Sequence, residues 1–217
     1  MKKLIILAIA AAVAVPAEAQ QAGDIIGRVR GILVAPDESS SGITPSFPNE
    51  RVSVSNSLMP EVDVTYMVSD HIGLELIAAT TRHRVSGVTG TTGGIGRLAT
   101  SWVLPPTLTL QYHPIPTGPV RPYVGIGANY TIFHSEDASD ALEAAVGPTR
   151  IRMSDSFGWA AQAGLDIDIG RNLFLNLDVK YIDMDTIARL DTTVAGTQRV
   201  RVSIDPLVFG IGIGTRF

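Results

Sequence analysis

Apolar and polar residues alternate with a period of two along most of this chain, and the alternation is clearest at its carboxyl-terminal end. A period of two is typical of a β-strand, in which successive side chains point to opposite faces. In a soluble sheet the face opposite the core is polar, whereas here it consists largely of glycine. This segment therefore predicts the closing strand of a transmembrane β-barrel, with Phe217 at the barrel closure. Its large apolar positions are Leu207, Phe209, Ile211, Ile213 and Phe217, and its small ones are Val208, Gly210, Gly212 and Gly214.

The same alternation recurs in seven earlier segments, so the chain is expected to form eight strands. The connections between the strands alternate between short turns and long segments rich in Gly, Ser and Thr, as in outer-membrane barrels. In the third long segment, Ser139 to Gly147 has a helix cap, helix-forming residues and a glycine stop. The expected fold is all-β, an eight-stranded antiparallel transmembrane β-barrel with one short helix in the third extracellular loop. The expected strands cover about 25–34, 52–68, 72–81, 102–113, 121–133, 156–169, 173–186 and 198–217, and the expected loops 36–50, 82–100, 134–152 and 190–197.

Prolines mark two irregular places in the predicted wall. Pro105 and Pro106 are adjacent and cannot donate to a strand ladder, which predicts a local gap and thus a lateral opening. In the last strand, the apolar residues fall on even numbers above Pro206 and on odd numbers below it. A shift of one residue at a proline is what a β-bulge produces, so a bulge is predicted at Asp205 and Pro206.

Charged residues on the predicted strands are expected to face the lumen, because a charge facing mid-bilayer lipid costs roughly 2 to 4 kcal/mol. Both signs are present, which favours mutual pairing as a lumen polar network over an ion-selective ring. The expected network consists of Arg28, Arg30, Glu61, Asp63, Gln162, Asp166 and Asp178.

Ile77 is a large apolar residue on the inward face, next to the inward Glu75. Together with Lys180, these residues are candidates for a lumen constriction. The alternative is ordinary packing, because an eight-stranded barrel has an interior just wide enough for side chains to fill.

The first residues have the features of an export signal. Met-Lys-Lys precedes the apolar run Leu4 to Val15, and Ala17-Glu-Ala19 provides small residues for cleavage. We expect residues 1–19 to be a signal peptide and residues 20–217 the barrel domain of a bacterial outer-membrane protein. No later stretch approaches the 18 consecutive apolar residues of a transmembrane helix.

Composition excludes several functions. The net charge of −4 argues against a nucleic-acid partner, and the absence of cysteine excludes disulfides. The four histidines lie in predicted turns, loops or strand ends, without a Ser-His-acid set or a His-x-x-x-His spacing. No enzyme activity is expected, and no catalytic, cofactor-binding or metal site is predicted.

Several stretches together are similar to the OmpW family of small outer-membrane proteins, along essentially the whole mature chain. They are Tyr66 to Thr80, Leu104-Pro-Pro-Thr-Leu108, Arg121 to Thr131, Tyr181 to Thr186, Asp205 to Phe209 and Arg216-Phe217. The resemblance implies a narrow, largely apolar lumen that passes small hydrophobic compounds sideways into the membrane through a gap in the wall. The inward Lys180 departs from that apolar lumen.

The expected function is therefore a porin-like passive channel for small, mainly hydrophobic molecules. The alternatives are a membrane-anchored structural or adhesive barrel whose loops bind partners, and a soluble periplasmic barrel. Expected partners are outer-membrane lipids, the barrel assembly machinery through the carboxyl-terminal strand, and lipopolysaccharide. Arginines near the outer ends of strands suit phosphate contacts, although solvated loop charge explains them equally well; they are Arg82, Arg84, Arg150, Arg152, Arg199 and Arg201.

Overall fold

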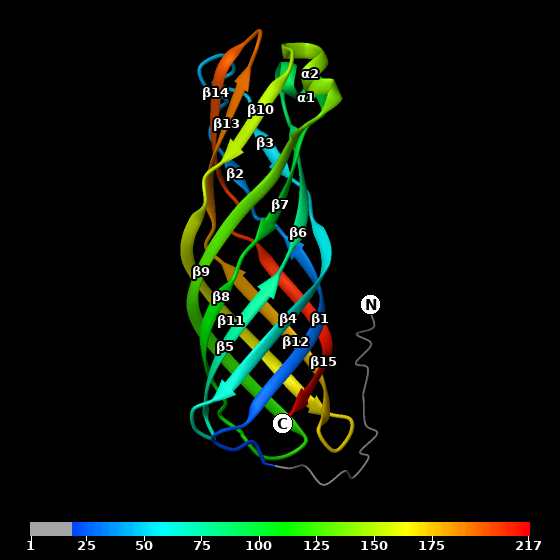
Figure 1. The fold of residues 1–217 in the computed structure, drawn as a ribbon, viewed down its shortest axis with the longest axis vertical. Coiled ribbons are helices and arrows are strands. Elements are labelled where there is room, and N and C mark those ends of the chain that lie inside the picture. Colours follow the sequence, from blue (N-terminus) through cyan, green and yellow to red (C-terminus); the bar gives the residue numbers. More distant parts are fainter. Residues whose placement is uncertain (1–18) are drawn as a thin grey trace, which may run out of the picture.

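The computed structural model describes residues 19–217, so the predicted signal peptide lies almost entirely outside the described residues. The chain forms a tall antiparallel barrel with two short helices at one end and the carboxyl terminus at the other (Figure 1). The helices are α1 (Gly90–Ile95) and α2 (Asp140–Val146). The strands are β1 (Ile25–Ala35), β2 (Ser39–Ser40), β3 (Val52–Val54), β4 (Ser57–Met67), β5 (Ile72–Ala79), β6 (Thr81–Gly87), β7 (Arg97–Leu104), β8 (Thr107–Tyr112), β9 (Val120–Ala138), β10 (Thr149–Met153), β11 (Ser156–Asp168), β12 (Leu173–Ile182), β13 (Asp185–Thr192), β14 (Gly196–Ser203) and β15 (Leu207–Arg216).

The lower half of the barrel is a closed ring of eight strands, which confirms the expected fold class. The hydrogen-bonded order is β11, β12, β15, β1, β4, β5, β8 and β9, and β9 pairs with β11 to close the ring. At the seam between the two ends of the chain, β1 pairs with β15, and Ile25 and Phe217 exchange two backbone hydrogen bonds at 3.1 and 2.9 Å. Phe217 therefore lies at the seam where β1 and β15 close the ring.

The outer and inner faces of this ring differ sharply in chemistry. Large apolar side chains are exposed on the outside, as expected of a surface that meets lipid. Arginine and acidic side chains from the same strands are buried inside. Val62, Val64 and Leu76 illustrate the outer face, and Arg28 and Glu75 the inner one.

The upper half extends the barrel well beyond this apolar belt. The predicted loops 82–100, 134–152 and 190–197 are wrong as loops, because much of each is strand: β6 and β7, the end of β9 with β10, and β13 with β14. These strands form two sheets, one of β9, β7, β6 and β3 and the other of β10, β13, β14 and β2. Their glycine, serine and threonine content predicted loops, whereas polar residues such as Arg82 and Arg84 lie on the outer face of these strands.

Side chains join the two upper sheets where the backbone ladder is interrupted. Between β9 and β10, the Met153 amide donates to Glu136 Oε1 at 3.2 Å and the Phe133 amide donates to Asp155 Oδ1 at 3.4 Å. On the other side, the Val52 amide donates to the hydroxyl of Ser40 at 3.0 Å. The upper wall is thus less continuous than the lower ring.

The β-bulge predicted at Asp205 and Pro206 is wrong. Even-numbered residues face the interior on both sides of Pro206, as shown by the buried Val202, Ile204 and Val208. Even-numbered side chains thus point inwards along the whole segment, and it is the environment that changes. The upper barrel has an apolar interior and a polar exterior, whereas the lower barrel has a polar interior and an apolar exterior. The ladder is interrupted here between β14 and β15, and Asp205 has a φ of 38°.

The expected helix in the third loop is present as α2, and a second helix was missed. Ser139 caps α2 by accepting a hydrogen bond from the Leu142 amide at 3.1 Å. The short helix α1 has no local side-chain cap. Instead, the Glu50 carboxylate accepts hydrogen bonds from the amides of Thr91 and Thr92 at 2.9 and 2.7 Å, a contact that no local pattern reveals.

Candidate functional site: an apolar chamber above a polar plug

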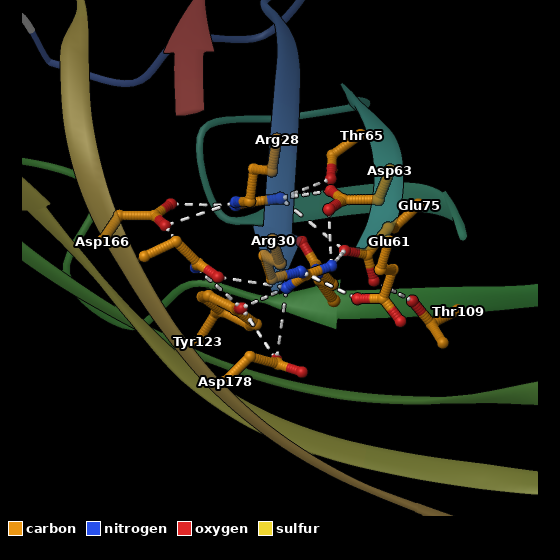
Figure 2. Close-up of polar contacts among 12 residues, drawn as sticks. Arg28, Arg30, Glu61, Asp63, Thr65, Glu75, Thr109, Tyr123, Asp166 and Asp178 are labelled. Carbon is orange, nitrogen blue, oxygen red and sulfur yellow. Dashed lines mark hydrogen bonds and ion pairs between the residues drawn. The ribbon is translucent and has the colours of Figure 1, made fainter. Parts of the chain in front are cut away.

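Side chains from most strands of the lower ring fill its interior with a dense polar cluster, which we call the polar plug. Its charged members are Arg28 and Arg30 from β1, Glu61 and Asp63 from β4, Glu75 from β5, Asp166 from β11, and Asp178 and Lys180 from β12. Figure 2 shows most of these side chains converging on the two arginines of β1. The structure brings these eight charged residues into one bonded network with Gln162, which the sequence placed inward, and with Tyr123, which sequence reasoning did not select.

Arg28 bridges two opposite walls of the barrel. Its Nη1 lies 3.0 Å from Asp63 Oδ1 and its Nη2 lies 2.8 Å from Asp166 Oδ2. The Arg28 and Asp63 side chains are fully buried. Because the planar guanidinium presents several donors at once, it satisfies carboxylates on both sides and fixes the separation of the walls.

Arg30 and Lys180 hold the upper layer of the plug together. Arg30 Nε lies 2.9 Å from Glu61 Oε1, and its guanidinium also contacts Asp63 (Figure 2). Lys180 Nζ lies 2.8 Å from Glu61 Oε1 and 2.6 Å from Asp178 Oδ1. Since buried charges are costly when unpaired, this mutual pairing lets the charges remain in the interior.

Gln162 of the predicted network and Glu75, a predicted constriction residue, are bonded to each other within the plug. Glu75 accepts hydrogen bonds from the Thr109 hydroxyl, at 2.7 Å, and from the Gln162 amide. Tyr123 donates its hydroxyl proton to Asp178 at 2.9 Å. Sequence reasoning did not select Tyr123, because an aromatic residue in a strand is expected to pack until its hydrogen-bond partner is known.

Directly above the plug, the interior becomes an apolar chamber. Its atom-free space is about 810 Å³, which includes the part open to solvent. Glu61 and Lys180 lie at its base, and most other lining residues are aliphatic, aromatic or methionine. These include Ile32, Val34, Ile77, Ala79, Val103, Phe133, Met153, Ile182, Met184, Val202, Ile204 and Val208.

A second apolar cavity continues the chamber towards the extracellular end. Val85, Ser101 and Met153 line both cavities, so the two are adjacent. Ile43, Leu98 and Leu190 line the upper one. Sequence reasoning missed most of these residues because it assigned their segments to loops. The signal that was available is the alternation of Thr81, His83 and Val85 with Arg82 and Arg84.

The three residues proposed for a constriction lie at the boundary between chamber and plug. Ile77 is 3% exposed and lines the chamber with Lys180. Glu75, two residues along β5, lies below them within the plug. The structure thus brings the three together, with Ile77 on the apolar side of the boundary and Glu75 on the polar side.

The double proline lies at the level of the chamber, where the ladder between two strand segments is interrupted. Pairing of β5 with β8 ends at Ile77 and Thr107, and pairing of β6 with β7 resumes at Thr81 and Val103. Pro105 lines the chamber, and Ala79 does so from the facing segment. The Pro105 carbonyl accepts a hydrogen bond from Asn129 Nδ2 at 3.2 Å, which ties this segment to β9.

His83 is a polar member of the chamber wall in the part of β6 above the apolar belt. Its Nδ1 donates to the Ser55 carbonyl at 2.7 Å, and its Nε2 lies 3.0 Å from the Thr81 hydroxyl. Burial lowers the pKa of His83, although the hydrogen bond to Ser55 acts in the opposite direction. The imidazole is therefore neutral at pH 7, which suits an apolar wall.

Within residues 19–217, no helix is long and apolar enough to cross a membrane. In the same part of the chain, no group of three or more His, Asp or Glu side chains is arranged to hold a metal ion.

A closed eight-stranded ring with an apolar belt, short turns at one end and tall strands at the other defines a small outer-membrane β-barrel. The chain belongs to the OmpW family, whose model matches residues 21–217, and it is an outer-membrane protein. The resemblance seen in the sequence is thus confirmed.

The relatives are similar over long stretches. The chain is 37% identical to outer membrane protein W of Escherichia coli over 221 residues, which cover all of both proteins. It is 31% identical over 177 residues to the dibenzothiophene metabolism operon protein PahQ of Pseudomonas aeruginosa, covering 78% of this chain and 76% of that one. The crystal structure of OprG from Pseudomonas aeruginosa superposes with a TM-score of 0.85 at 34% identity, covering 92% of this chain and 98% of that one.

Proposed function

We propose that this barrel is a narrow passive channel that takes small, mainly hydrophobic molecules from the extracellular side and releases them laterally into the membrane. One observation carries the proposal: an apolar chamber lies above a bonded polar plug, beside an interrupted stretch of wall. An apolar molecule is favoured in the chamber, at about 25 cal/mol for each Å² of apolar surface removed from water. It is not favoured among the buried charges below.

The polar plug argues for a sideways path. A molecule that continued downwards would have to separate ion pairs whose side chains are almost fully buried, such as Arg28 with Asp63 and Lys180 with Glu61. Breaking a buried pair costs several kcal/mol, because the freed charges cannot find water. The proposed path therefore passes Ile77 and leaves the wall near Pro105 and Pro106.

The printed name of one relative is consistent with such a substrate class. PahQ is named for an operon of dibenzothiophene metabolism, and dibenzothiophene is an apolar aromatic compound. This name supports the proposal by analogy alone, since it describes the relative and its operon.

A charge at Ile77 tests the path. In cells that depend on this barrel, Ile77→Lys is expected to reduce uptake of a small apolar fluorescent probe several-fold and to leave a polar probe of similar size unchanged. Ile77→Leu keeps the apolar wall, and Val194→Lys adds the same charge at an exposed turn between β13 and β14. Unchanged apolar uptake in a folded Ile77→Lys barrel would count against the path.

Cysteine pairs test the lateral opening, because the natural chain has no cysteine. Ala79→Cys with Pro105→Cys joins the two sides of the interrupted segment, whereas Thr81→Cys with Val103→Cys joins residues already opposite in the ladder. Oxidation is expected to block apolar uptake in the first pair alone, and reduction to restore it. Equal uptake before and after bridging of the first pair would place the opening elsewhere.

The second candidate is an anchored structural or adhesive barrel. The height of the strands above the apolar belt, and the two helices at their end, favour it (Figure 1). A barrel that transports neither probe and stays folded after shortening of the turn between β13 and β14 would support this candidate.

A further inference from the structure

Five arginines are grouped on the outer face of β10, β13 and β14, above the apolar belt. The strand register places Arg152 opposite Arg189, and Arg189 opposite Arg199, so three arginines form one row across three strands. Arg150 lies on this face one row further from the membrane, and Arg201 one row closer to it. All five side chains are exposed, and we call them the arginine ladder.

The ladder is electrostatically unfavourable on its own. Like charges directly opposite on neighbouring strands destabilise a sheet. Among the described residues, one member has a salt bridge: Arg189 Nη2 lies 3.0 Å from Asp191 Oδ1, and both side chains are partly exposed. Arg150, Arg152, Arg199 and Arg201 have no carboxylate within 4.0 Å in that part of the chain. Asp191 also lies opposite Arg150 in the strand register and is the one carboxylate within these rows among the described residues. One carboxylate does not offset five arginines, so the face carries a net positive charge.

Two acidic groups closer to the membrane, Asp185 on β13 and Asp155 between β10 and β11, are bonded to other residues. Asp185 accepts a hydrogen bond from the hydroxyl of Ser203, the residue opposite it in the pairing of β13 with β14. Asp155 accepts one from the Tyr130 hydroxyl at 2.9 Å. Neither compensates the row of Arg152, Arg189 and Arg199.

The height of the ladder indicates what it faces. Trp159 and Tyr181 pack with ring centroids 5.0 Å apart at the top of the lower ring, as aromatic residues do at a membrane interface. Arg189 follows Tyr181 by eight residues, which corresponds to about 20 Å above the interface for a strand tilted by about 40°. At that height, the outer leaflet of an outer membrane presents the phosphorylated and acidic sugars of its glycolipid.

We propose that the arginine ladder binds the phosphate and carboxylate groups of lipopolysaccharide sugars in the outer leaflet. Guanidinium groups form paired hydrogen bonds with such groups, and a row across three strands matches a ligand with several anionic groups. The bound glycolipid neutralises the repulsion within the row. This site is on the outside of the wall and does not depend on the channel function proposed above.

The test compares purified barrels in detergent for binding of purified lipopolysaccharide. The triple variant Arg152→Gln, Arg189→Gln, Arg199→Gln is expected to bind at least tenfold more weakly than the natural chain. The control variant Arg82→Gln, Arg84→Gln, Arg97→Gln removes the same charge from β6 and β7 and is expected to bind nearly normally. Equal weakening in both variants would show general attraction and would overturn the site.

Two further measurements separate ligand and fold effects. Lipopolysaccharide stripped of phosphate is expected to bind the natural chain weakly. Inorganic phosphate at equal concentration is expected not to displace the intact glycolipid. The opposite result in either measurement would reject the proposed ligand. The triple Gln variant is expected to unfold at a temperature no lower than that of the natural chain when no glycolipid is present. If that variant does not fold, the variant Arg152→Lys, Arg189→Lys, Arg199→Lys replaces it. This variant keeps the charge but loses the paired hydrogen bonds of the guanidinium groups. Unaltered binding of lipopolysaccharide would then reject recognition by paired hydrogen bonds.

Discussion

Lys180 lies where the polar plug meets the apolar chamber, and its surroundings explain how a charge is kept there. The ammonium group contacts Asp178 of its own strand β12 and, across the interior, Glu61 of β4, from which β15 and β1 separate it in the ring. Lys180 also lines the chamber, so the same residue contacts both environments. The departure from an apolar lumen noted in the sequence therefore begins at the floor of the chamber and extends through the polar plug below it.

Replacing Lys180 with Met should destabilise the barrel by about 3 to 5 kcal/mol, because Glu61 and Asp178 would lose a shared buried cation. The free energy of unfolding is measured by urea titration in detergent micelles. Arg171→Met, which removes a cation from an exposed turn, is the control and should change little. A loss below about 1 kcal/mol for Lys180→Met would contradict the importance of this pairing.

At the scale of strands, glycine decides how closely neighbouring segments approach in the narrow ring. A Cβ at Gly127 of β9 would meet the Leu108 carbonyl oxygen and the Thr109 Cα of β8, which are backbone atoms. Because a backbone cannot move aside as a flexible side chain can, the close pairing of β8 with β9 requires glycine here. This pairing also supports the segment that contains the double proline.

Gly127→Ala is therefore expected to destabilise the barrel by about 1 to 3 kcal/mol or more, through forced separation of β8 from β9. Gly31→Ala on β1 is the matched control, because its nearest neighbour, the Ile211 carbonyl oxygen, is 4.0 Å away. Thermal unfolding of the two purified variants gives the comparison. Equal melting temperatures would show that the wall at β8 and β9 can relax.

For the whole molecule, closure depends on the two ends of the chain meeting. The pairing of β1 with β15 runs from Ile26 and Arg216 to Ala35 and Leu207, and Phe217 continues it through its backbone. The Phe217 side chain is itself 77% exposed, so it contributes little to interior packing. Its backbone and its ring are thus expected to have separable roles.

Phe217→Ala should leave refolding in detergent nearly unchanged, because both backbone hydrogen bonds to Ile25 remain. In cells, the same variant is expected to assemble several-fold less barrel, if the assembly machinery reads the terminal aromatic ring. Deletion of Phe217 removes the two bonds as well and should impair both processes. Refolding is measured by the electrophoretic migration of the unheated, folded barrel, and cellular assembly by the amount of barrel in outer-membrane fractions. Normal cellular assembly of Phe217→Ala would contradict recognition of the ring.

Sequence reasoning was correct where the outer face of a strand meets lipid and failed where that face meets water. In the lower ring, alternation identified the inward side of each strand, including Arg28, Glu75 and Lys180, because lipid forces polar groups inwards. In the upper barrel the rule inverts, since water covers the outer face. Val202 and Ile204 are inward there, and the inversion was mistaken for a bulge.

The sequence by itself determined the number of strands, the side of the lower ring on which each residue lies, the capped helix α2 and the family. These depend on a local period of two, a local cap and stretches shared with relatives. The tertiary structure alone decided that Arg28 joins Asp63 to Asp166, that Glu50 caps α1, and that Ile77 lines a chamber closed below by Lys180 and Glu61. The physical reason is that these contacts join residues from separate strands and loops, whose positions are fixed only when the barrel closes.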